Sequence, residues 1–193
     1  MKKRSPVIYI DTNIARDYTE RRDIDSVYFL ETIRDKKWDC ISSGFLIMEL
    51  SDIEKDKIFF NNKVVKKNWD VDHFLRERRK KDLREEDFND LDGYVDIFLR
   101  SLKFINFYDP SEKGWNLALH LSTHSNLSAT DLIHLATAFS LDSDIFVTRD
   151  EYLIKEGNKI IKNKSLLTSL KIKALKICRP KEATSILSKM GFN

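Results

Sequence analysis

Two short apolar runs that end at acidic residues place the strongest constraint on how this chain folds. The first covers residues 7–10 and is followed at once by Asp11, and the second covers residues 145–148 and is followed by Arg149 and Asp150. Unbroken apolar runs of this length are typical of strands that are buried on both faces of a parallel sheet. The two runs therefore predict that Asp11 and Asp150 lie at the carboxyl ends of buried strands.

Helical patterns alternate with these strands along the chain. Val27, Leu30 and Ile33 recur at helical spacing. Further strands are expected at residues 38–42, 104–107 and 174–178. Alternating strands and helices predict an α/β fold, a three-layer α/β/α sandwich with a mainly parallel central sheet.

Two helix starts bring further acids into the pattern. Ser42 or Ser43 can cap a helix that carries Glu49 beside an apolar face. Ser128 stands three residues before Asp131, which is the spacing of a capping box ahead of an apolar helix. We expect Asp131 in the first turn of that helix and Glu49 about two turns into the other.

Three other signals mark the second half of the chain. Asp109 is expected to cap a helix that has Pro110 in its first turn, and Pro180 is expected to open a short C-terminal helix. The lysine-rich stretch after Gly157 is interpreted as a loop. Residues 155–189 hold ten Lys or Arg and only two Glu, which fits either a surface for a polyanion or a solvated basic face.

A charged segment interrupts the α/β pattern at about residues 54–103. It has a near balance of acidic and basic residues, and we interpret it as a helical insert in a single domain that spans residues 1–193. Its basic run at 76–81 could bind phosphates. Acids follow directly at Asp82, Glu85, Glu86 and Asp87, so the sequence favours a solvated helix.

Composition excludes several classes of protein. An apolar fraction of 41% and an aromatic fraction of 11% are too high for a disordered chain. Two cysteines do not make a disulfide framework, and no apolar run approaches the roughly twenty residues that span a bilayer. We expect a globular cytoplasmic protein that does not insert into a membrane.

Four acids are expected to meet at one edge of the sheet, because strands end there and the helices that follow them begin there. They are Asp11, Glu49, Asp131 and Asp150. Each alone has an ordinary explanation as a capping, loop or surface residue. Together they must be protonated or neutralised by a cation, since two carboxylates 4 Å apart repel by about 4 kcal/mol at an effective dielectric of 20. Oxygen ligands favour one or two Mg²⁺ or Mn²⁺ ions, which activate water for attack on phosphodiesters.

Four stretches of the chain, taken in order, resemble a PIN domain. These are residues 10–13, 42–49, 128–136 and 146–150. The resemblance implies a metal-dependent ribonuclease acting on single-stranded RNA, with Asp11, Glu49 and Asp131 as the main acids and Asp150 as the more variable fourth. VapC-like toxins are the largest such group, so it also implies a cognate antitoxin and a homodimer.

The resemblance assigns roles to neighbouring residues as well. Thr12, Asn13 and the Thr148 hydroxyl match positions that order such a site by hydrogen bonding. Apart from the resemblance, we expect Arg149 to contact a substrate phosphate because it stands beside Asp150. His134 lies one turn beyond Asp131, and we interpret it as a packed, hydrogen-bonded histidine outside the site.

Two other functions remain open from the sequence. A catalytically silent PIN-like module could bind RNA or a protein through the charged insert, although a silent site has no physical need to keep four repelling acids. A phosphatase of the haloacid-dehalogenase type also begins with an Asp after an apolar strand. It would need a second Asp two residues later, where this chain has Asn13.

Overall fold

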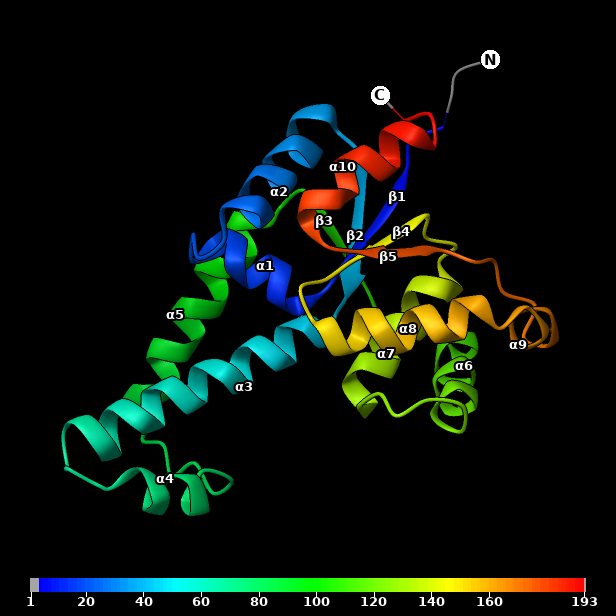
Figure 1. Cartoon of the computed structure of the whole chain (residues 1–193). Helices are drawn as coiled ribbons and strands as arrows, with labels where there is room; N and C mark the ends of the chain where they lie inside the picture. Colours follow the sequence, from blue (N-terminus) through cyan, green and yellow to red (C-terminus); the bar gives the residue numbers. More distant parts are fainter. Residues whose placement is uncertain (1–3, 193) are drawn as a thin grey trace. The chain divides into compact units, whose positions relative to one another are not determined.

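A five-stranded, all-parallel sheet forms the centre of the fold in the computed structural model, which describes residues 4–192 (Figure 1). The strand order is β3-β2-β1-β4-β5. The strands are β1 (Val7–Ile10), β2 (Asp39–Ser43), β3 (Ile105–Tyr108), β4 (Ile145–Val147) and β5 (Lys176–Cys178). This confirms the predicted α/β class with a parallel sheet.

The first strand is apolar throughout because it lies in the middle of the sheet. Ile8 pairs with Cys40 of β2 on one side and with Ile145 of β4 on the other. Ile8, Tyr9 and Ile10 are fully buried. Since successive side chains of a strand point to opposite faces, both faces of β1 must be covered by helices.

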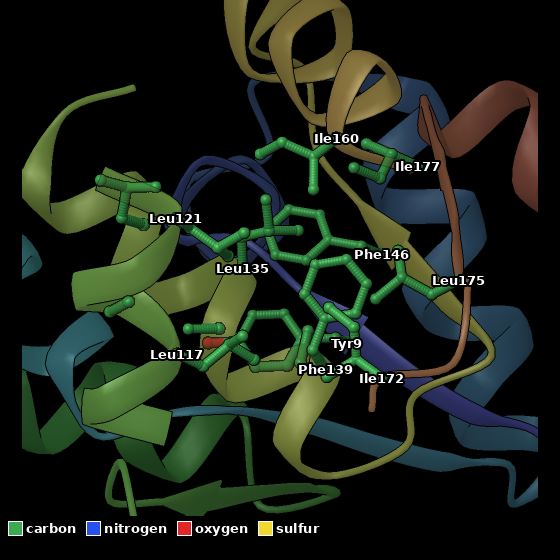
Figure 2. Packing of buried hydrophobic residues seen from close by; sticks show 14 of the residues in the cluster. Tyr9, Leu117, Leu121, Leu135, Phe139, Phe146, Ile160, Ile172, Leu175 and Ile177 are labelled. Atoms are coloured by element: carbon green, nitrogen blue, oxygen red, sulfur yellow. The ribbon is translucent and has the colours of Figure 1, made fainter. Parts of the chain in front are cut away.

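Four helices cover one face of the sheet: α6 (Glu112–Ser122), α7 (Ala129–Ser140), α8 (Glu151–Lys162) and α9 (Lys164–Ser169). Tyr9 and Phe146 stack against each other with their ring centroids 5.0 Å apart. Leu135 and Phe139 of α7 and Ile177 of β5 belong to the same buried cluster (Figure 2). This cluster is the apolar core on the α7 side of the sheet.

Three helices lie on the opposite face: α1 (Thr12–Thr19), α2 (Ile24–Lys36) and α10 (Pro180–Lys189) (Figure 1). The α10 helix packs on α2 and on β4. Leu30 and Ile33 of α2 are fully buried, as their helical spacing predicts. Pro180 begins α10, which confirms the predicted helix start. No helix within residues 4–192 is long and apolar enough to cross a membrane.

Two local predictions in the second half of the chain are wrong. The stretch after Gly157 is helical, because α8 runs through this glycine to Lys162 and α9 follows. A Cβ on Gly157 would lie 2.4 Å from Cδ1 of Ile177, so the glycine allows α8 to approach β5 closely. The cap of α6 is Ser111, whose Oγ accepts from Gly114 N at 3.2 Å, and not Asp109.

Residues Ile47–Ser101 form a second compact unit, distinct from the first unit of residues 4–46 and 102–192. It is helical, as the sequence predicts for the insert. Its elements are most of α3 (Phe45–Phe60), a π-helical turn (Asn61–Val65), α4 (Val71–Glu77) and α5 (Glu85–Ser101). Phe59 contacts both Phe74 and Trp69, with centroids 5.7 and 6.1 Å apart. These aromatic rings form a small core within the second unit.

A buried carboxylate anchors the N-terminal segment to β4. Asp144 accepts hydrogen bonds from Arg4 Nη2 (2.5 Å), Val7 N (3.0 Å) and Lys173 Nζ (3.2 Å). Burial acts to raise the pKa of Asp144, but the hydrogen bonds from Arg4, Val7 and Lys173 outweigh it and hold this pKa below its ordinary value. The carboxylate therefore stabilises the fold at neutral pH, and this contribution is lost as the pH falls below about 4.

We expect Asp144→Asn to lower the free energy of unfolding at pH 7 by about 1–3 kcal/mol, because three donors lose a charged acceptor. The difference from the wild type should shrink as the pH is lowered to 3, because the unfolded-state carboxylate takes up its proton at a higher pH than the native one. Urea unfolding at both pH values measures this. Asp35→Asn is the control, since Asp35 is exposed. A deficit that is equal at both pH values would contradict the assignment.

Candidate active site

Two of the segments predicted to form the site border the point where the direction of strand order reverses. The chain passes from β1 to β2 and β3 on one side, and then returns to β4 and β5 on the other side of β1. In open α/β sheets, ligands bind outside the carboxyl ends of the strands at such a switch point. Residues 11–13 follow β1 and residues 148–150 follow β4, so both segments border this point.

Asp11 is held in one orientation by hydrogen bonds to both of its carboxylate oxygens. Its Oδ2 accepts from Thr148 Oγ1 at 2.6 Å and from Asn13 Nδ2 at 2.7 Å. Its Oδ1 accepts from Thr12 N at 2.7 Å. The residue is only 7% exposed. A carboxylate fixed in this way can present its remaining lone pairs to a ligand without first losing rotamer freedom.

Asn13 and Thr148 also tie the two strand ends to each other. Asn13 Nδ2 donates to Thr148 Oγ1 at 3.0 Å, and Asn13 Oδ1 accepts from Arg149 N at 3.1 Å. Thr148 Oγ1 accepts in addition from Asp150 N at 3.0 Å. All three residues that the sequence singled out beside the acids, Thr12, Asn13 and Thr148, thus donate a hydrogen bond to Asp11.

A buried pair of side chains fixes α7 against the end of β1. Tyr9 OH and His134 Nδ1 lie 2.7 Å apart, and His134 Nε2 lies 3.4 Å from Thr12 Oγ1. Burial raises the pKa of Tyr9 far above its usual value, and the charge of Asp11 adds to this, so the phenol stays protonated. The protonated phenol and the imidazole therefore share a hydrogen bond inside the core, and the other ring nitrogen of His134 faces Thr12. His134 is a buried, hydrogen-bonded residue, as the sequence suggests.

Asp131 lies one turn before His134, in the first turn of α7. Its backbone N donates to Ser128 Oγ at 3.2 Å, and Ser128 Oγ donates to its Oδ2 at 2.7 Å. The first contact is the N-cap half of the predicted capping box, whereas in the second the Ser128 hydroxyl, and not its backbone N–H, donates to the Asp131 carboxylate. Residues at i and i+3 share a helix face, so Asp131 is on the side of α7 that carries His134 toward Thr12.

Asp150 and Glu49 are placed differently. Asp150 is exposed, and its Oδ1 accepts from Tyr152 N at 2.7 Å and from Leu153 N at 2.9 Å, so its carboxylate caps α8. Capping is the ordinary explanation that the sequence offers for an acid at such a position. Glu49 is half-buried on α3 and belongs to the second unit.

Arg149 is anchored by an acid that the sequence analysis did not single out. Its Nη1 lies 2.5 Å from Asp17 Oδ2 and 3.8 Å from Asp23 Oδ1. The hydrogen bond to Asp17 raises the pKa of Arg149 further above its ordinary value. Asp17 is buried on α1 among Ile14, Ala15 and Tyr18. In the sequence, the signal that could have identified Asp17 is an acid among the apolar residues Ile14, Ala15 and Tyr18.

The comparisons with known proteins leave the family open. No family model matches this chain. No curated protein matches it either. What is established is therefore the parallel α/β fold and the hydrogen-bond network around Asp11.

The acids fit a hard divalent ion by their chemistry, because they offer only oxygen donors. Within the described chain, residues 4–192, no three Asp, Glu, His or Cys side chains are grouped so that they could hold one metal ion. In the first unit, Asp11 caps α1 through its contact with Thr12 N, Asp131 lies in the first turn of α7, and Asp150 caps α8.

Proposed function

We propose that this chain is a Mg²⁺- or Mn²⁺-dependent endoribonuclease that hydrolyses phosphodiester bonds in single-stranded RNA. The observation that supports it most is the position of Asp11 at the switch point of the sheet, with Thr148 from the neighbouring strand end and Asn13 both donating to one carboxylate oxygen. An acid held so firmly at a ligand-binding edge is typical of a site that binds a cation.

Asp11 and Asp131 would be the first ligands of the ion, and the resemblance to PIN domains adds Glu49 and Asp150. When bound, Mg²⁺ or Mn²⁺ lowers the pKa of a water molecule and stabilises charge on the phosphate. Thr12, Asn13 and Thr148 would keep the Asp11 carboxylate oriented toward the ion. Asp150 would act through water while its other contacts cap α8. Arg149 would contact a substrate phosphate from its anchor on Asp17.

The resemblance to VapC-like toxins supports a narrower form of the proposal. In that form the chain is the toxin of a type II toxin–antitoxin pair, works as a homodimer in the cytoplasm, and is held inactive by a cognate antitoxin. Induced expression of the wild-type chain should then arrest growth. Expression of the Asp11→Asn variant should not. Arrest by both would contradict the toxin assignment.

Cleavage of a fluorescent single-stranded RNA by the purified protein tests the activity itself. We expect cleavage with Mg²⁺ or Mn²⁺, none after chelation by EDTA, and recovery when excess metal is added back, because the carboxylates alone do not generate a nucleophile. A double-stranded RNA of the same sequence is the control for strand selectivity. Absence of cleavage of every RNA tested, with either metal, would overturn the proposal.

A second candidate, a catalytically silent module that binds RNA or a protein, is favoured by one observation. Within residues 4–192 no metal-holding group of three ligands is assembled. Calorimetric titration with Mn²⁺ separates the two candidates. Heat of binding that is lost in Asp11→Asn supports the nuclease, and absence of binding supports the silent module.

A further inference from the structure

The second unit has a groove of about 640 Å³ that has no part in the network around Asp11. Leu75 of α4 and Phe88 of α5 form an apolar part of its wall, and Lys55 and Arg79 line it with positive charge. Phe88 is 46% exposed. The volume lies within the range of small-ligand pockets, about 300–1,000 Å³. We refer to this feature as the insert groove.

Two of the four cations that line the insert groove are neutralised within it. Arg78 Nε donates to Asp56 Oδ2 at 2.6 Å, and Lys81 Nζ lies 3.1 Å from Asp56 Oδ1. Lys81 also pairs with Asp52. Burial acts to raise the pKa of Asp56, but hydrogen bonds from Arg78 and Lys81 keep this pKa below its ordinary value, so the pairs persist at neutral pH.

The other two cations, Lys55 and Arg79, have no ion-pair partner in the part of the chain that the structure describes. Both line the insert groove. With Arg78 and Lys81 balanced by Asp52 and Asp56, these two cations leave the groove with a net positive charge. An occupant that carries negative charge is therefore favoured.

The acids that follow the basic run 76–81 do not reduce this charge. Asp82 pairs with Lys63, and Glu86 pairs with Arg84. Asp87 accepts from Asn62 Nδ2 at 2.8 Å and from Arg84 N at 2.8 Å. None of these acids lines the groove. The sequence favours a solvated helix here, whereas the structure makes residues 78, 79 and 81 of this run part of a groove wall.

We infer that the insert groove binds a segment of single-stranded nucleic acid, with phosphates at Lys55 and Arg79 and a base against the ring of Phe88. Unpaired cations beside an exposed aromatic ring are the combination by which proteins hold single strands without reading their sequence. An acidic peptide could pair with the two cations, but it would gain less from contact with the Phe88 ring. The inference that the strand is RNA rests on the proposed function.

The test measures binding of a short fluorescein-labelled single-stranded RNA to the full chain by fluorescence anisotropy, in EDTA so that no cleavage occurs. Phe88→Ala should weaken binding by about fivefold to 150-fold, because stacking on one base is lost. Arg79→Gln should reduce the slope of log affinity against log salt by about 0.7, as expected for one lost phosphate contact. Phe88→Leu, which keeps an apolar side chain but removes the ring, should also weaken binding.

Two matched controls come from the same unit. Lys67→Gln removes the same charge from an exposed lysine outside the groove, and Ile97→Ala truncates an apolar side chain that is 67% exposed on α5. Both should bind as the wild type does, within about twofold. Equal binding by Phe88→Leu, Arg79→Gln and the wild type would overturn the inference. So would competition by an oligoglutamate peptide at concentrations where neutral peptides and single-stranded DNA do not compete.

The binding test and the cleavage test fail independently. RNA binding that depends on the groove, without any metal-dependent cleavage, would support the insert groove as a binding site and contradict the proposed nuclease activity. Metal-dependent cleavage, with an RNA affinity that is unchanged in the groove variants, would support the nuclease activity and contradict RNA binding by the insert groove.

Discussion

Asp11→Asn is expected to reduce RNA cleavage by more than about a hundredfold. Substituting residues that only support metal ligands already lowers activity by about 10–100-fold, and Asp11 is proposed as a ligand itself. The substitution keeps the size of the side chain and removes its charge. Cleavage rates at saturating Mg²⁺ or Mn²⁺ measure the effect. Asp35→Asn, which removes an exposed charge from α2, should cleave at the wild-type rate.

The same substitution should lower stability only modestly. In the wild type, Thr12 N, Asn13 Nδ2 and Thr148 Oγ1 all donate to the carboxylate. An amide has a single acceptor oxygen, so at least one donor loses its partner, at about 1–3 kcal/mol. Urea unfolding should therefore show a folded variant with a lower midpoint. Wild-type activity in that folded variant would remove Asp11 from the site, and complete unfolding would show that its role is structural.

Phe146→Ala should lower the free energy of unfolding by about 3–5 kcal/mol, the range for removing a buried phenylalanine ring. The side chain is fully buried and stacks on Tyr9, and β4 lies between β1 and β5. Neighbouring strands limit how far the backbone can move to fill the cavity. Since domains of this kind are stable by about 5–15 kcal/mol, the loss is a large fraction of the total.

Urea unfolding followed by circular dichroism measures this loss. Tyr28→Ala is the matched control, because it removes an aromatic ring that is 66% exposed on α2. It should change stability by less than about 0.5 kcal/mol. A loss below about 1 kcal/mol for Phe146→Ala would mean that the stacked pair with Tyr9 is not part of a well-packed core.

The strands β1 and β4 could be predicted from the sequence because each is an apolar run that stops at polar residues, and this pattern depends only on local burial. Gly157 misled the prediction, since a glycine that allows close approach of α8 to β5 looks the same in sequence as one that ends a helix. The short helix α1 was missed because its apolar face, Ile14, Ala15 and Tyr18, is interrupted by polar residues, of which Asp17 is itself buried.

The candidate site was predictable only in part. The sequence places Asp11 and Thr148 at strand ends, but only the strand order makes β1 and β4 neighbours and brings these two residues within hydrogen-bond distance. The pairs Tyr9–His134 and Arg149–Asp17 join residues that are 125 and 132 positions apart. No local pattern specifies such contacts, because they depend on how the helices pack on the sheet.

The position of β1 in the middle of the sheet also determines when the sheet can be completed while the chain is being synthesised. Asp11 and Thr148 are 137 residues apart, and β1 lacks its second neighbour until β4 has been made. At about 5–20 residues per second, the first strand waits on the order of ten seconds on the ribosome with one edge unpaired. An unpaired apolar strand is prone to wrong associations in that interval. The growing chain should therefore depend on chaperones early, and the Asp11 network should form only near the end of translation.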